Sequence, residues 1–521
     1  MKNVLRGARF ALLGAAVALA FADSSIVVLA LPALLGKFDA SIQGIAWVIT
    51  SYNVVVAVVA VALVRSKRRF DPVRLTRHGL IVFAAASLAC AFSPSLWALV
   101  AFRSIQGLGG AMLLAGSLPL ARSLAGDPER VAARWAVAGA LGAALGPAVG
   151  GALTEAFDWR AIFLVQAPIA ALAVVAALGR VAPVPAPAPV PGRTRSLGAN
   201  AALGLLSGAL VGALFLVVVV LIEVWGFSPL RAAVVVSALP AGTLLARLVR
   251  GGSTAAGSLL LAGGLAALAF TPGPNELWFA AALGLCGLGL GLAVPSLTGA
   301  AGDWSVAARH IGLVAALLAL TPLLAHDVSK ASTQAERVGT AAVLDAPIDT
   351  SAKVPLAVEL ATGIARAPTG SPPDLESVFT RHSSTPGVRQ LEHSLEGSIR
   401  PIAAHAFRRS FLLSALFALV VAVPLALRPR RALVPAAAAA AALLVAEMGA
   451  GGYSYGSVAE RNPCHPPATV SGSSFDRIAQ RVVLRGVDEL ACQTHTTREQ
   501  LVLDLADKGD RAKRWVEGFL G

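Results

Sequence analysis

The sequence contains little charge, and it lacks the motifs of the common enzyme classes. Only 14% of its 521 residues are charged, whereas 56% are hydrophobic. About a quarter of the residues in a soluble domain are charged, so this composition argues against a soluble fold. A phosphate-binding glycine loop, a zinc-protease histidine pair and a nucleophile elbow are all missing from the sequence. We therefore expect no enzymatic activity, no metal and no organic cofactor.

The net charge of +14 does not indicate a nucleic-acid-binding surface. The stretch 326–407 contains 9 acidic and 7 basic residues, and the stretch 453–521 contains 9 of each. The basic excess therefore lies in the short loops between hydrophobic segments, as is typical of the cytoplasmic side of a membrane protein. We expect a lipid bilayer and no nucleic acid as the partner of this chain.

Thirteen apolar segments predict an all-α polytopic membrane protein, because helices of about 20 apolar residues satisfy their backbone inside a bilayer. Six segments fall in 1–180, a Pro-rich cytoplasmic linker occupies 181–198, six more fall in 199–427, and the last falls in 428–452. The expected spans are 9–35, 45–64, 78–92, 96–120, 131–152, 161–178, 199–222, 229–249, 255–270, 277–294, 307–325, 411–427 and 432–450. The first resembles a signal peptide, but its apolar run continues past Asp23, so we expect it to be retained.

The basic residues predict the orientation. Loops on the side of the amino terminus carry 21 Lys and Arg residues, and the short loops on the other side carry 3. Basic residues stay in the cytoplasm, so we expect a cell-membrane protein with a cytoplasmic amino terminus. An odd number of spans then makes the carboxyl terminus, the insertion 326–407 and the tail 453–521 extracytoplasmic.

The insertion and the tail each contain one periodic apolar pattern. Spacings of 3 and 4 predict an amphipathic helix at the end of the insertion, formed by Val388, Leu391, Leu395, Ile399, Ile402 and Ala406. A second helix is predicted in the tail by Phe475, Ile478, Val482, Val487 and Leu490. Thr497 and Gln500 form a possible capping box for a third helix.

Cys464 and Cys492 lie in the polar tail, which is too short to bury a large core alone. In an oxidising compartment a disulfide between them supplies the missing constraint. A metal site is the alternative, because His465 adjoins Cys464 and His495 follows Cys492 by three residues. We favour the disulfide.

Charged residues inside the apolar segments are rare. Asp23 lies near the middle of the first expected span, and Arg103 lies well inside the fourth. A charge in a bilayer is costly, so such residues mark a binding site, a proton relay or a buried pair. A carboxylate can gain or lose a proton when its burial or its charged neighbours change.

Four stretches of the sequence resemble the drug:proton antiporter branch of the major facilitator superfamily, within residues 8–431. They are 23–32, 47–52, 103–109 and 142–151, which include Asp23, Trp47, Tyr52, Arg103, Gln106, Gly142, Gly146, Pro147, Gly150 and Gly151. The resemblance implies two lobes of six helices each, to which this chain adds a thirteenth helix. The loop 64–74 departs from the family pattern, because Arg68 stands about where the family has an acidic residue.

The resemblance implies a secondary transporter that exports small amphipathic or hydrophobic compounds in exchange for protons. We expect Asp23, Arg103 and Gln106 to interact across a central cavity and couple proton movement to transport; a static pair that fixes helix packing is the alternative. Because glycine has no side chain, the glycine cluster of the fifth span can approach a neighbouring helix closely, and Pro147 permits a bend there. The cluster is therefore either a hinge or a tight packing seam. Trp47, Tyr52, Asn53 and Glu223 are candidates to line the cavity.

Two other functions stay open on the sequence alone. One is a non-transporting scaffold that binds an envelope partner through its extracytoplasmic insertion and tail. The other is the handling of a lipid or a lipid-linked precursor. No motif specifies an oligomeric state, and we expect a monomer.

Overall fold

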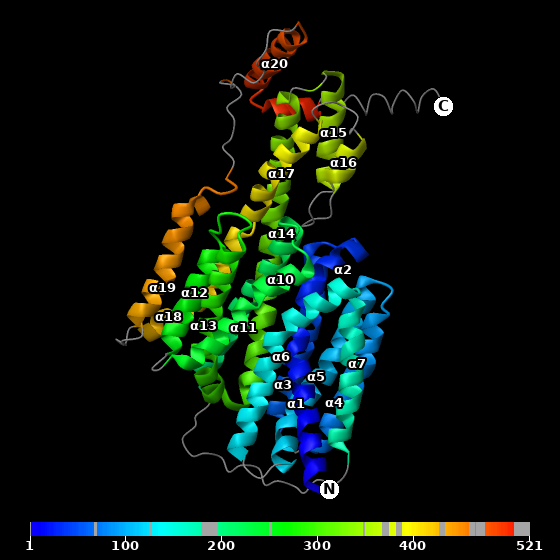
Figure 1. Ribbon diagram of the computed structural model, residues 1–521, viewed down its shortest axis with the longest axis vertical. Coiled ribbons are helices and arrows are strands. Elements are labelled where there is room, and N and C mark those ends of the chain that lie inside the picture. Colours follow the sequence, from blue (N-terminus) through cyan, green and yellow to red (C-terminus); the bar gives the residue numbers. More distant parts are fainter. Residues whose placement is uncertain are drawn as a thin grey trace. The chain divides into compact units, whose positions relative to one another are not determined.

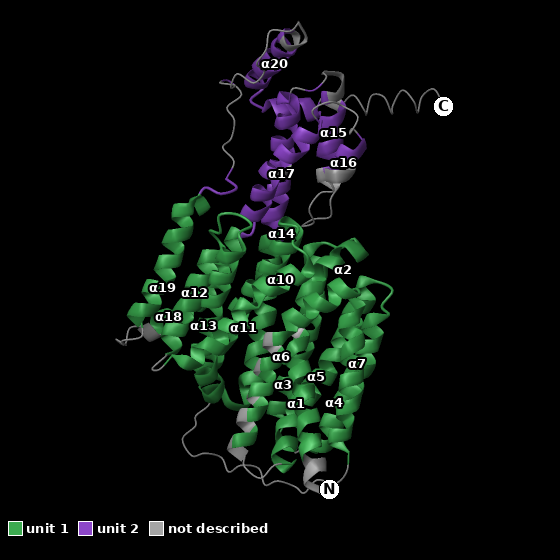
Figure 2. Cartoon of the chain, viewed as in Figure 1, with its two compact units in different colours: residues 1–324, 408–453 green, residues 325–407, 454–521 purple. Residues whose placement is uncertain are grey.

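The computed structural model describes residues 2–66, 70–124, 128–178, 196–249, 253–346, 348, 350–366, 375–381, 388–426, 433–457, 464 and 475–504. Within these ranges every regular element is a helix (Figure 1). The chain divides into two units (Figure 2). The first consists of Met1–Leu324 and Arg408–Tyr453, and the second consists of Ala325–Phe407 and Ser454–Gly521.

The amino-terminal half of the first unit begins with a bent helix. Its helices are α1 (Lys2–Ile26), α2 (Leu31–Phe38), α3 (Ile42–Arg65), α4 (Pro72–Ala91), α5 (Leu96–Leu124), α6 (Pro128–Ala156) and α7 (Arg160–Ala173). A 3-10 turn, Val27–Ala30, separates α1 from α2, and the two arms meet at 45°. Pro32 has no N–H to donate, which favours the break at this place. The first expected span, 9–35, is therefore bent rather than straight.

The second half of the first unit contains π-helical turns. Its elements are α8 (Leu197–Val211), η3 (Gly212–Leu216), α9 (Val217–Val219), η4 (Val220–Val224), α10 (Pro229–Val236), α11 (Ala238–Leu245), η5 (Ala246–Leu248), α12 (Thr254–Leu268), α13 (Glu276–Ala301), η6 (Gly302–Trp304), the first part of α14 (Ser305–Asp345), α18 (Arg408–Ala426), α19 (Leu433–Glu447) and η7 (Met448–Gly452). Gly302 has a φ of 62°, which lets the chain turn between α13 and α14.

Polar side chains cap the starts of these helices, where backbone N–H groups lack helical partners. The capping residues are Ser41, Asp71, Ser196, Ser228, Ser253 and Asn275. Asp71, the acid of the divergent loop, accepts hydrogen bonds from the N–H groups of Val73 (2.9 Å) and Arg74 (3.4 Å). It therefore caps α4. Arg68 and most of the linker 181–198 lie outside the described residues.

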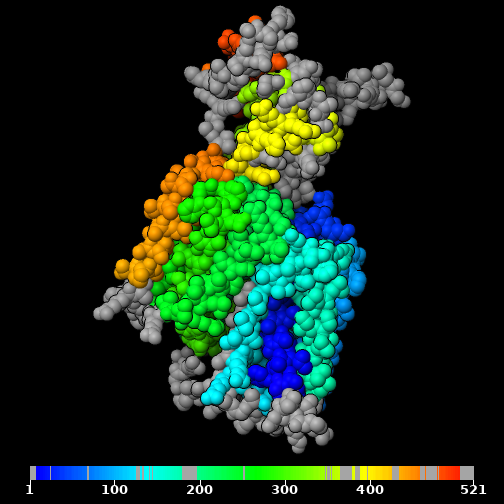
Figure 3. All heavy atoms as spheres, in the orientation of Figure 1, coloured from blue at the N-terminus to red at the C-terminus, as the bar shows by residue number. Residues whose placement is uncertain are grey.

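Nine helices of the described chain are long and apolar enough to cross a membrane, or up to ten if the bent pair in 7–38 forms one span. The apolar helix α12 is shorter, at 15 residues. Each expected span overlaps a helix of the structure. The count of thirteen spans stays a prediction. On the face shown in Figure 3, part of α1 is exposed between α6 and α7.

The second unit contains a helical insertion, for most of which the sequence pattern carried no prediction. It comprises the end of α14, α15 (Thr350–Arg366), α16 (Leu375–Arg381) and α17 (Val388–His405). The predicted amphipathic helix is confirmed as α17. All six residues of its apolar pattern are buried, and four of them join a core with Leu356, Leu360 and Phe379.

The tail contains α20 (Phe475–Gln493), which confirms the predicted helix. Its buried face is not the apolar one: Gln480, Asp488 and Ala491 are buried, whereas Ile478, Val482 and Leu490 are exposed. The structure joins Cys464 to Cys492 by a disulfide. Residues 498–504 are helical, and the Thr497 hydroxyl accepts a hydrogen bond from the Gln500 N–H at 3.2 Å. The Gln500 amide binds Asp504, so only half of the predicted capping box forms.

Buried polar contacts join the tail to the insertion. The Arg498 side chain, 4% exposed, lies 2.9 Å from Asp345 of α14 and 3.8 Å from Asp488 of α20. Lys353 of α15 donates to the Leu344 carbonyl at 2.7 Å and to the Gln480 amide oxygen at 3.3 Å. Burial lowers the pKa of Lys353, and the neighbouring Asp345 opposes that shift. The insertion and the tail, which are far apart in the sequence, are therefore held together by buried polar contacts.

We predict that Arg498→Met loosens the second unit. Removing one partner of a buried ion pair leaves the other charges uncompensated, which costs about 3–5 kcal/mol. Amide hydrogen exchange of the full-length chain should show faster exchange in α20 and at 498–504. Arg485→Met, which changes an exposed arginine of α20, is the matched control and should leave exchange unchanged. Equal protection of α20 in the two variants would contradict this role for Arg498.

Candidate functional site

An ion pair between α1 and α5 is fully buried in the amino-terminal half. The Arg103 Nη1 atom donates to both carboxylate oxygens of Asp23, at 2.7 and 2.9 Å. Both side chains are 0% exposed. The two rare intramembrane charges are therefore in direct contact, as the sequence predicted, and neither reaches solvent.

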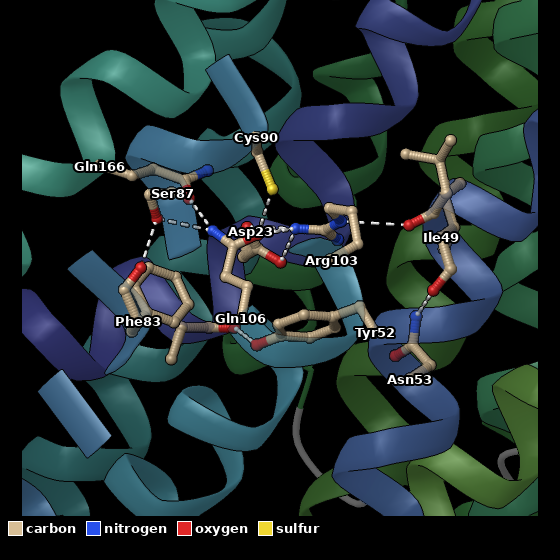
Figure 4. A network of polar contacts seen from close by, with 12 residues as sticks. Asp23, Ile49, Tyr52, Asn53, Phe83, Ser87, Cys90, Arg103, Gln106 and Gln166 are labelled. Carbon is tan, nitrogen blue, oxygen red and sulfur yellow. Dashed lines mark hydrogen bonds and ion pairs between the residues drawn. The ribbon is translucent and has the colours of Figure 1, made fainter. Parts of the chain in front are cut away.

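Further polar groups surround this pair (Figure 4). Arg103 also donates to the Gln106 side-chain oxygen (2.6 Å) and to the Val48 carbonyl (3.1 Å). The Gln106 amide nitrogen in turn donates to Ser87 and to the Gln166 side-chain oxygen, both at 2.8 Å. The network thus connects α1, α3, α4, α5 and α7.

Aromatic rings complete the shell around the guanidinium. Its carbon lies 4.6 Å from the centre of the Tyr52 ring and 5.9 Å from that of Phe163. Two glycines allow Tyr52 to approach α5, because a side chain at Gly107 would meet the Tyr52 carbonyl at 2.6 Å and one at Gly110 would meet its hydroxyl at 2.5 Å. Arg103 Nη2 has no hydrogen-bond partner within the described chain.

The pair does not face a solvent-filled space in this conformation. Gln106, Tyr52 and Phe163, which contact Arg103, all belong to the amino-terminal half, and Asp23, Arg103 and Gln106 have no accessible surface. We expected the two side chains to interact across a central cavity, whereas in this conformation protein atoms enclose the pair. Close packing explains the difference, since α3, α4, α5 and α7 leave no room for water around the pair.

The candidate cavity residues do not form one cluster. Tyr52 lies at the ion pair and is fully buried. Asn53 is also buried, and its amide donates to the Ile49 carbonyl at 2.8 Å. Trp47 is 41% exposed. Glu223 lies in η4 of the other half and is partly exposed. The structure therefore brings only Tyr52 into contact with Arg103.

The glycine cluster holds α6 against two neighbours. Side chains at Gly142, Gly146 and Gly150 would collide with Ala18, Ser25 and Ile26 of α1. On another face, a side chain at Gly151 would meet the Pro229 carbonyl and the Ala233 side chain of α10, each at 2.6 Å. Pro147 lies inside the helix between these contacts. The helix α6 therefore packs against α1 in its own half and against α10 in the other half.

A charged contact lies beside this seam. Glu155, beyond the expected end of the fifth span, accepts a hydrogen bond from the Leu230 N–H at 2.8 Å, at the start of α10. This bond and the nearby Ser228 hydroxyl lower the pKa of Glu155. The contact therefore stabilises the seam above the ordinary carboxyl pKa, and it is lost as the pH falls through the lowered value.

Gln166, Ser87 and Phe163 also belong to the site, although the sequence pattern did not predict them. Gln166 is a polar residue in the middle of an otherwise apolar span, and this signal could have identified it. A serine and a phenylalanine are common in such spans and carry no comparable signal. Among the described residues, no group of three or more His, Cys, Asp and Glu side chains could hold a metal ion.

Comparison with known families identifies the class of protein. The Major Facilitator Superfamily model matches residues 13–325. The chain belongs to this superfamily of membrane transporters, and it is a multi-pass membrane protein and not an enzyme.

Curated relatives match part of the chain. The drug efflux pump JefA of Mycobacterium tuberculosis is 30% identical over 162 residues, which are 30% of this chain and 32% of JefA. The multidrug efflux pump LfrA of Mycolicibacterium smegmatis is 35% identical over 150 residues, 28% of this chain and 30% of LfrA. The matched stretch thus spans about a third of each relative.

Solved structures share the fold. A bacterial homologue of the human lysosomal transporter Spinster, inward-facing and unoccupied, has a TM-score of 0.56 and 13% identity, and the match covers 84% of this chain and 98% of that one. The nucleoside transporter NupG has a TM-score of 0.51 and 10% identity, with coverages of 80% and 99%. At these identities the likeness shows the fold alone.

We predict that Gly142→Ala destabilises the chain. The added methyl group collides with the Ala18 backbone and must push α6 away from α1. Such overpacking costs about 1–3 kcal/mol. Thermal unfolding of the purified protein in detergent measures the effect. The control is Gly14→Ala in α1, where nothing lies within 4 Å of the added atom. An equal melting temperature for the two variants would refute the tight seam.

Proposed function

We propose that this transporter exports small amphipathic or hydrophobic compounds across the cell membrane in exchange for protons. The observation that carries the proposal is the buried Asp23–Arg103 pair. A carboxylate in a bilayer interior is energetically costly, and such residues mark substrate pathways and proton relays. The efflux pumps among the relatives support the direction of transport. A relative named lincomycin resistance protein, from Streptomyces lincolnensis, supports a drug-like substrate.

Protonation of Asp23 is the proposed coupling step, with H⁺ as the coupling ion. In the closed network the carboxylate balances the Arg103 charge through two hydrogen bonds. A proton on Asp23 removes that balance and leaves a buried cation that is uncompensated. The helices that enclose the pair must then rearrange, so that Arg103 gains water or another partner. Release of the proton on the other side of the membrane restores the pair.

The glycine seam of α6 is the proposed site of movement between the halves. Alternating access requires one half to rock against the other. The close approach of α6 to α10 at Gly151 provides a contact between the halves that can open, and opening it would also break the bond between Glu155 and the Leu230 N–H. In the proposed topology the amino terminus is cytoplasmic, and the second unit and the carboxyl terminus are extracytoplasmic.

We predict that Asp23→Asn abolishes proton-driven efflux. Cells that express the chain are loaded with ethidium, lincomycin or 2-naphthoate, and efflux is followed with and without a protonophore. For at least one compound the wild-type chain should give efflux that the protonophore stops. Efflux by Asp23→Asn should fall to that of cells without the chain, because the amide cannot exchange a proton.

Two controls separate coupling from folding. Asp39→Asn changes an exposed acid with a φ of 46°, which Asn tolerates, and should leave efflux unchanged. The melting temperature of purified Asp23→Asn shows whether the variant is folded. Wild-type efflux from a folded Asp23→Asn protein would locate the coupling elsewhere and leave the pair a packing element.

The disulfide provides a test of the topology. A membrane-impermeant maleimide applied to intact cells should label Cys464 and Cys492 only after reduction, because Cys90 and Cys286 are buried in the membrane unit. A variant with both tail cysteines replaced by serine should stay unlabelled. Labelling that requires cell lysis would place the tail in the cytoplasm and reverse the orientation.

A further inference from the structure

Arg309 of α14 lies over an aromatic ring of the opposite half. Its guanidinium carbon is 5.3 Å from the centre of the Phe21 ring on α1. Trp135 of α6 packs edge-on against Phe21, with 5.6 Å between ring centres, and its N–H donates to the Ser117 hydroxyl at 2.9 Å. Three helices of the two halves therefore contribute one cation and two aromatic rings to the same place.

The placement of Arg309 is fixed by the packing of its helix. A side chain at Gly312 would collide with the Gly204 backbone, and one at Gly204 would meet the Ala308 carbonyl at 3.1 Å. These close contacts press α14 against α8. The next residue, His310, is buried and bonded through Nδ1 to the Val306 carbonyl at 2.8 Å. Arg309 therefore projects toward α1 because its helix is held on the other side.

The Arg309 charge has no partner within the described part of the chain. It makes no ion pair and no hydrogen bond there, and its guanidinium lies over the Phe21 ring. Asp23, the buried carboxylate of α1, is already bonded to Arg103. Arg309, Phe21 and Trp135 each keep part of their surface accessible. An unpaired cation between apolar helices is costly, so a partner from outside the protein would stabilise it.

We propose that Arg309, Phe21 and Trp135 form a binding site for compounds that join a carboxylate to an aromatic ring. The guanidinium presents a planar set of donors that matches a carboxylate, and the two rings offer faces and edges for stacking. The inference rests on the proposed function and names acidic aromatic compounds as its substrate class. A cationic compound would be repelled by Arg309 at the same place.

A simpler role for Arg309 is retention of its loop in the cytoplasm. That role needs only a positive charge, so it is kept by lysine and does not require contact with Phe21. Ligand recognition needs the planar fork, which lysine lacks. Arg309→Lys and Arg309→Gln therefore separate the two roles.

Binding to the purified full-length chain in nanodiscs of phosphatidylcholine tests the site. Isothermal titration calorimetry compares 2-naphthoate with its neutral analogue 2-naphthamide. We expect Arg309→Gln to weaken 2-naphthoate binding about tenfold or more, which is the loss of one charged hydrogen bond. Arg309→Lys should weaken it less, and neither change should alter 2-naphthamide binding. The control is Arg134→Gln, an exposed arginine 5.9 Å from the Phe10 ring.

Two results would overturn the site: equal 2-naphthoate affinity in Arg309→Gln and wild type, or 2-naphthamide binding as tight as 2-naphthoate binding. If Arg309→Gln does not fold, Phe21→Leu provides the second test and should weaken the binding of both compounds.

Adding phosphatidylglycerol to the nanodiscs identifies the natural anion. If phosphatidylglycerol competes with 2-naphthoate, the site binds a lipid phosphate, and the assignment of a small carboxylate as its ligand is overturned. Unchanged 2-naphthoate binding supports that assignment.

This measurement needs no transport, so its failure is distinct from failure of the proposed function. A chain that binds 2-naphthoate through Arg309 but gives no protonophore-sensitive efflux would contradict proton-driven export and keep the site. A chain that exports compounds independently of Arg309 would contradict only the site.

Discussion

The buried ion pair between Asp23 and Arg103 is the constraint on which the amino-terminal half depends. Two charges without access to water must satisfy each other and find further hydrogen bonds, or the cost of desolvation exceeds their attraction. Here the Val48 carbonyl and Gln106 supply those bonds, and Tyr52 covers the guanidinium. Because the partners come from α1, α3, α4, α5 and α7, a change in the charge of Asp23 affects the packing of five helices at once.

Glycine packing places this network next to the surface on which the halves meet. Helix α1 carries Asp23, and the glycines of α6 contact the same helix over the segment from Ala18 to Ile26. The opposite side of α6 contacts α10 of the second half at Gly151. A rearrangement around Asp23 therefore has a direct mechanical route to the seam, through α1 and then α6. Small residues line most of that route, and the aromatic contact between Phe21 of α1 and Trp135 of α6 lies beside it.

The sequence predicted the charged core of the site better than its surroundings. Asp23 and Arg103 stand out because charges are rare in apolar spans, and their pairing follows from that rarity. Ser87 and Gln166 are neutral, cost less to bury and give a weaker signal, so only the structure connects them to Gln106. The same limit applies to α20: its spacing predicted a helix, but not that Asp488 would face inward toward Arg498 while Val482 stays exposed. That choice depends on partners from α14 and α15, more than a hundred residues away in the sequence.

The central claim is that Asp23 exchanges a proton while its contact with Arg103 breaks and re-forms. Infrared difference spectroscopy of the reconstituted protein during a downward pH step tests this claim most directly, because protonated and ionised carboxyl groups absorb at different frequencies. We predict a protonated-carboxyl band that is absent from Asp23→Asn and present in Glu223→Gln. A difference spectrum that is the same for wild type and Asp23→Asn would contradict the account.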